Sequence, residues 1–84
     1  MYIVVWMDSF QVDFGTFYEM YPDVAAAKAA VKEYVIDSHG EEFANALDEW
    51  IGQDGDTTIF IENSEYRIEE VRMLTQQQGE GLSW

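Results

Sequence analysis

Residues 33–65 form an acidic stretch that constrains this chain more than any other feature. The stretch holds ten carboxylates and no lysine or arginine, so His39 is its only possible cation. The carboxylates are Glu33, Asp37, Glu41, Glu42, Asp48, Glu49, Asp54, Asp56, Glu62 and Glu65. No catalytic motif elsewhere in the sequence indicates a competing site. The sequence therefore describes a small, acidic, aromatic-rich domain, which narrows the kinds of partner it can have.

Size and charge limit the function further. The 84 residues suit a single domain with a small core, and a hydrophobic content of 48% argues against global disorder. The formal net charge of −13 opposes direct binding to nucleic acid or to anionic lipid, whereas it would steer a basic partner toward the domain. In a second interpretation the acidity serves only solubility, or adaptation to a salt-rich host.

The sequence also favours a cytoplasmic location. The chain has no cysteine, and therefore no disulfide or thiolate chemistry. Residues 1–6 lack the basic region and the small-residue cleavage site of a signal peptide. The longest apolar run is far shorter than the ~20 residues that span a bilayer.

The pattern of apolar residues predicts two β-hairpins. Residues 2–7 are apolar on both alternating faces, which is typical of a central strand, and residues 16–21 form its partner. In that partner we expect Tyr18 to enter the core. Residues 57–62 and the segment from Glu65 onward form the second hairpin, with a turn at Asn63 and Ser64.

Two helices are expected between the hairpins. Pro22 and Asp23 open the first helix, and two lysines, Lys28 and Lys32, flank its apolar face. That face consists of Val24, Ala27, Val31, Tyr34 and Val35. At the break, either Gly40 stops the first helix or Ser38 and Glu41 form the capping box of the second. The second helix runs to about Ile51 and ends at Gly52, with an apolar side made of Phe43, Ala46, Leu47, Trp50 and Ile51.

The predicted fold class is α+β. The element order β-β-α-α-β-β indicates a single small domain, in which a four-stranded antiparallel sheet carries two helices packed on one face. We expect this domain to span residues 1–74, and residues 75–84 to form a flexible C-terminal tail.

An acidic arc on the second helix is the main candidate binding surface. Glu41, Glu42, Asn45, Asp48 and Glu49 fill an arc of about 120° opposite the apolar side. The arc contains no cation for an i,i+4 pair, and Asp48 and Glu49 lie near the helix C-terminus, where the dipole disfavours them. The predicted partner-binding acids are Glu41, Glu42, Asp48, Glu49, Asp54, Asp56, Glu62 and Glu65.

Surplus aromatic residues form a second candidate surface. A core that already holds the residues Trp6, Tyr18, Tyr34, Phe43, Trp50 and Tyr66 cannot accommodate all of Phe10, Phe14, Phe17, Phe60 and Trp84. Exposed aromatics beside charge act as anchors in protein interfaces, so Phe14 and Phe60 are predicted to bind a partner. In the alternative interpretation, these loop aromatics fold back over the edges of the core.

The sequence predicts neither catalysis nor a cofactor. His39 has no supporting constellation, and adjacent acids on a solvated helix lack the burial that acid–base pairs need. Asp54-Gly55-Asp56 lacks the further ligands and the closing glutamate of a calcium loop. We therefore expect a non-enzymatic protein without catalytic residues, bound metal or cofactor.

In size, charge and lack of a catalytic motif, the chain resembles the small acidic inhibitors of phages and mobile elements, such as anti-CRISPR and anti-restriction proteins. The resemblance is one of composition and assigns no role to any single residue. It implies a nucleic-acid mimic that binds the basic surface of a DNA- or RNA-binding protein. The alternative is a small regulatory or assembly subunit that binds through exposed aromatics, with the acidity serving solubility.

Repulsion among the carboxylates leads to a first prediction. With a net charge of −13 on one small domain, we expect the melting temperature to rise as sodium chloride is added from a low starting concentration. Differential scanning fluorimetry measures this shift. A melting temperature that falls steadily with salt would show that attractive ion pairs outweigh the repulsion.

Overall fold

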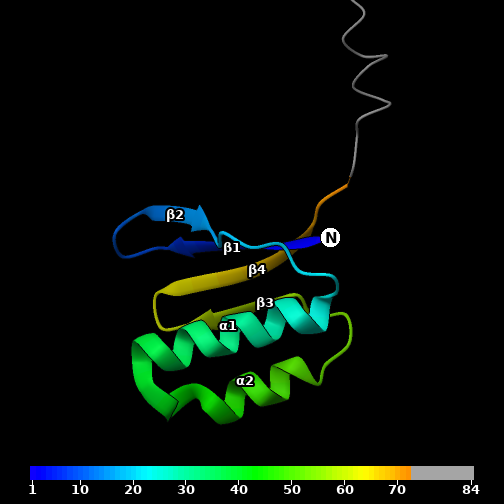
Figure 1. Cartoon of the computed structure of the whole chain (residues 1–84). Coiled ribbons are helices and arrows are strands. Elements are labelled where there is room, and N and C mark those ends of the chain that lie inside the picture. The colour runs from blue at the N-terminus through cyan, green and yellow to red at the C-terminus, as the bar shows by residue number, and fades with distance from the viewer. Residues whose placement is uncertain (73–84) are drawn as a thin grey trace, which may run out of the picture.

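The computed structural model describes residues 1–72, and its elements follow the predicted order (Figure 1). They are β1 (Tyr2–Asp8), β2 (Asp13–Thr16), α1 (Val24–His39), the 3₁₀ helix η1 (Gly40–Phe43), α2 (Ala44–Ile51), β3 (Thr58–Ile61) and β4 (Ser64–Glu70). The predicted α+β fold, a four-stranded antiparallel sheet with both helices on one face, is confirmed. The tail predicted over residues 75–84 lies outside the described residues.

The sheet has the strand order β2-β1-β4-β3, so β1 is central, as its doubly apolar pattern predicted. Val4 of β1 pairs with Ile68 of β4, and both are buried beneath the helices. The buried core consists of Val4, Ala27, Val31, Val35, Leu47, Trp50, Ile61, Tyr66 and Ile68. The alternate side chains of the strands point to the other face, which neither helix covers (Figure 1).

Local signals fix the ends of α1. Asp23 is its N-cap, and the Oδ1 atom accepts a hydrogen bond from the Ala26 N–H at 2.8 Å. Gly40 ends the helix at a φ of 78°, which favours glycine, and its N–H donates to the Ile36 carbonyl. The glycine stop therefore forms, whereas η1 begins after His39 without a side-chain cap.

The second strand differs from its prediction. β2 pairs with β1 over Asp13–Thr16 and not over residues 16–21, because the chain leaves the sheet after Phe17 and returns only for a bridge at Tyr21. Because the chain leaves the sheet early, two aromatic side chains take positions opposite to those predicted. Phe17 packs against the core, whereas Tyr18, which was predicted to enter it, is fully exposed.

The second hairpin turns one residue earlier than predicted. Ile61 pairs with Ser64, so Glu62 and Asn63 form the turn, and Glu62 adopts a positive φ of 54°. The shift moves each cross-strand partner by two positions. Because strand side chains alternate with a period of two, this shift leaves every side chain on the same face of the sheet.

Lys28 is buried, although the sequence placed it on the flank of the apolar face. Its side chain is only 2% exposed, and Nζ donates hydrogen bonds to the carbonyl oxygens of Trp50 at 2.9 Å and Gln53 at 2.7 Å. The ammonium also lies 4.9 Å from the centroid of the Trp50 ring. Lys28 therefore supplies donors and positive charge to the carbonyl end of α2.

This contact predicts a large effect for one substitution. We expect Lys28→Met to lower the free energy of unfolding by about 2–4 kcal/mol, because it leaves the carbonyls of Trp50 and Gln53 without their donor. Urea denaturation followed by circular dichroism measures the loss. The control Lys32→Met removes the same charge but only a partly exposed ion pair with Asp48, so its loss should stay below about 1 kcal/mol. Equal losses would contradict this role of Lys28.

Candidate functional site

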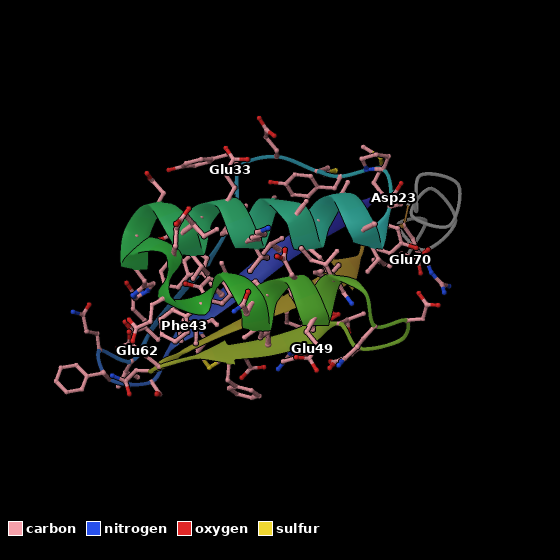
Figure 2. The ribbon with its side chains drawn as sticks, turned by 90° about the horizontal axis from the view of Figure 1, so that it is seen from below. Asp23, Glu33, Phe43, Glu49, Glu62 and Glu70 are labelled. Carbon is pink, nitrogen blue, oxygen red and sulfur yellow. The ribbon has the colours of Figure 1, made fainter. Side chains whose placement is uncertain are left out.

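The fold brings some of the predicted acidic residues together and separates others. Glu41, Glu42, Asp48 and Glu49 all lie exposed on η1 and α2. These four carboxylates are the acidic arc. Figure 2 shows Glu49 on α2 and Glu33 pointing away from α2 on the far flank of α1. Negative charge therefore occurs along both helices.

One acid of the arc is paired within the domain. Lys32 of α1 forms an ion pair with Asp48, which corrects the interpretation of Asp48 as an acid without a cation. The partner comes from the other helix, so the i,i+4 spacing within α2 did not reveal it. Among the described residues, no ion pair involves Glu41, Glu42 or Glu49.

Glu62 and Glu65, two further predicted site residues, lie in the second hairpin. Glu62 occupies the β3–β4 turn, where its Oε1 atom is 3.4 Å from His39 Nδ1. Glu65 lies on the helix-free face of the sheet, and its Oε2 atom accepts a hydrogen bond from Arg67 Nη2 at 2.8 Å. This bond, with the charge of Glu65, raises the pKa of Arg67. Glu65 therefore does not extend the arc, whereas Glu62 lies beside His39, the residue that directly precedes η1.

The turn at Asp54-Gly55-Asp56 connects α2 to β3. Gly55 adopts a positive φ of 86°, and Asp56 Oδ1 accepts a hydrogen bond from the Thr58 N–H at 3.3 Å. Asp54 and Asp56 are both exposed beyond the end of α2. Within residues 1–72, no three histidine or carboxylate side chains are grouped as metal ligands would be.

The two predicted aromatic anchors lie on the same face of the sheet. Phe14 pairs with Met7, Met7 with Glu65, and Glu65 with Phe60, so these residues form one row across the four strands. Phe14 is 74% exposed and Phe60 is 70% exposed, which contradicts the alternative in which they cover the core. Because neighbouring strands are about 4.8 Å apart, the two rings stand about 14 Å from each other. Phe14 and Phe60, with Met7 between them, form the aromatic row.

An acidic groove on the flank of α1 was not predicted. It lies between α1 and residues 17–21, and it has a volume of about 710 Å³. Glu19 and Glu33 line it together with Tyr21, and burial first, then these two carboxylates, raise the pKa of the Tyr21 hydroxyl. The sequence signal that could have revealed it is the run of alanines at 26, 29 and 30, which leaves open space beside the helix.

A comparison with protein-family models, curated protein sequences and solved structures finds no match to this chain. Within the described residues, no helix is both long and apolar enough to cross a membrane. Candidate roles are therefore inferred from the surfaces themselves.

The pKa of Tyr21 reports on the negative charge inside the groove. We expect Glu33→Gln to lower the pKa of Tyr21, because the variant removes one of the charges that disfavour the phenolate. A ¹³C NMR titration of the tyrosine rings measures the change. Glu42→Gln removes the same charge from η1, and it should leave the pKa of Tyr21 unchanged. An identical shift in both variants would mean that only net charge matters.

Proposed function

We propose that this chain is a non-enzymatic acidic protein that binds a basic surface of another protein through its helix layer. The distribution of cations carries this proposal. Lys28 is buried beneath the end of α2, and Lys32 is paired with Asp48. The two arginines, Arg67 and Arg72, lie in β4 and directly after it. Glu41, Glu42 and Glu49 are therefore exposed carboxylates that no lysine or arginine of the described residues neutralises.

The most specific form of the proposal is nucleic-acid mimicry. Glu42 and Glu49 are separated by about 11–12 Å along the axis, from the rise per residue of a 3₁₀ turn followed by an α-helix. Negative charges held at fixed spacing on a rigid helix suit a groove that normally binds a phosphate backbone. Such a protein would inhibit by occupying the groove, in the manner of anti-CRISPR and anti-restriction proteins.

The aromatic row favours a second candidate function. Phe14 and Phe60 stand exposed on the face that no helix covers, and large exposed aromatics are frequent anchors in protein interfaces. In this reading the chain is a small regulatory or assembly subunit. The partner would contact the sheet, and the acidity of the helices would serve solubility.

Charge reversal on the arc tests the leading proposal. The wild-type chain first captures its partner from a host lysate, and association with the purified partner is then measured by surface plasmon resonance. We expect Glu42→Lys with Glu49→Lys to weaken binding by at least about tenfold, mainly through a slower association rate at low salt. Asp48 is left unchanged because it pairs with Lys32. Wild-type binding should also weaken as salt is raised, and DNA or RNA should compete for the partner.

Two matched variants make the result decisive. Glu69→Lys with Glu70→Lys gives the same change in net charge at the end of β4, and it should alter binding far less. Phe14→Ala with Phe60→Ala removes both aromatic anchors. If this aromatic pair abolishes binding while the arc reversal binds as wild type does, the mimic proposal is wrong and the second candidate replaces it.

A further inference from the structure

The acidic groove beside α1 has an apolar floor and an aromatic wall. Three alanines of α1, Ala26, Ala29 and Ala30, line it. The wall includes Phe17 and Tyr34, whose ring centroids are 5.1 Å apart. Tyr34 also meets the edge of the buried Tyr66 ring at 6.0 Å, so this wall is continuous with the core. The core therefore supports one wall of the groove.

The rim of the groove is negatively charged. Glu19, Glu33 and Asp37 line it, and no lysine or arginine does. Two of these carboxylates act on one point, because Glu19 and Glu33 both raise the pKa of Tyr21 inside the groove. Glu33 points away from α2, so the groove faces a different direction from the acidic arc (Figure 2).

These walls suit one kind of side chain. An arginine carries an apolar stem that can lie along alanine, and a planar guanidinium that stacks on aromatic rings. The guanidinium also donates two parallel hydrogen bonds to one carboxylate. A lysine ammonium cannot match this geometry, because it acts as a point charge. An acidic or purely apolar ligand would instead leave the three carboxylates partly desolvated without a partner.

We propose that the groove between α1 and residues 17–21 docks an arginine side chain from a basic segment of the partner protein. The proposal rests on the proposed function for the basic character of the partner. It adds a second contact on the opposite flank of α1 from the acidic arc. It also assigns the recognition of arginine to named residues, Glu19, Glu33 and Tyr34.

The test uses the full chain labelled with ¹⁵N and a tetra-arginine peptide with blocked ends as the probe. We expect chemical-shift changes concentrated at residues 17–21 and at the alanines of the floor. Tetra-lysine should bind several-fold more weakly, because it lacks the stacking guanidinium. Tetra-citrulline, which has the same shape without the charge, should not bind.

Paired variants separate the groove from general attraction. Glu19→Gln with Glu33→Gln should weaken tetra-arginine binding by roughly five- to tenfold, since two charge-assisted contacts are lost. Glu42→Gln with Glu49→Gln removes the same charge from the arc, and it should change affinity by less than about twofold at physiological salt. The melting temperature of each variant confirms that it is folded.

The outcomes distinguish this inference from the function on which it rests. Shift changes confined to η1 and α2, or equal losses in the two glutamine pairs, would overturn the groove proposal while leaving the acidic arc in place. Chemical-shift changes in the groove would support the groove proposal. If Glu42→Lys with Glu49→Lys also leaves partner binding unchanged, the acidic arc is rejected as a binding surface.

Discussion

The buried ammonium of Lys28 joins the two helices at the point where α2 ends. α2 is eight residues long, and a helix of that length is not stable alone in water, so it depends on tertiary contacts. Leu47 and Trp50 anchor its apolar side, and Lys28 binds the carbonyls at its C-terminal end. These contacts determine which side of α2 faces the core. The direction in which Glu49 of α2 points is therefore a consequence of the core.

The same contact explains how the domain separates its charges. Positive charge in the helix layer is used to join elements, through Lys28 to the end of α2 and through Lys32 to Asp48. The remaining cations lie in or directly after β4, where Arg67 contacts Glu65 and Glu69 on the helix-free face. The helix-free face thus combines the ion pairs of Arg67 with two exposed aromatic rings, Phe14 and Phe60.

Much of this arrangement could be predicted from the sequence, because periodicity reports which side of an element is buried. α1 buries Ala27, Val31 and Val35 of its predicted apolar face, although Tyr34 of that face is 47% exposed. β1 is central in the sheet, as its doubly apolar pattern predicted. What could not be predicted depends on contacts distant in the sequence. No local pattern distinguishes the buried Lys28 from Lys32, since the difference lies in carbonyls 22 and 25 residues away. The acidic groove was missed for a related reason: it exists because the chain leaves the sheet at Phe17, which alternation alone did not show.

α1 lies between the two negatively charged surfaces, with the acidic arc beyond one flank and the groove along the other. Lys32 relieves repulsion on the side of α2, but the lining of the groove includes no lysine or arginine. A basic partner would supply the missing cations, so its binding and the stability of the fold are coupled. Salt relieves the same repulsion by screening, without any defined geometry. The two effects depend on different variables. Stabilisation by a bound partner depends on the partner's concentration relative to its dissociation constant, whereas screening depends on ionic strength. A stabilising effect that tracks a dissociation constant, and that disappears with Glu19 and Glu33, therefore indicates a specific site and not only a charged surface.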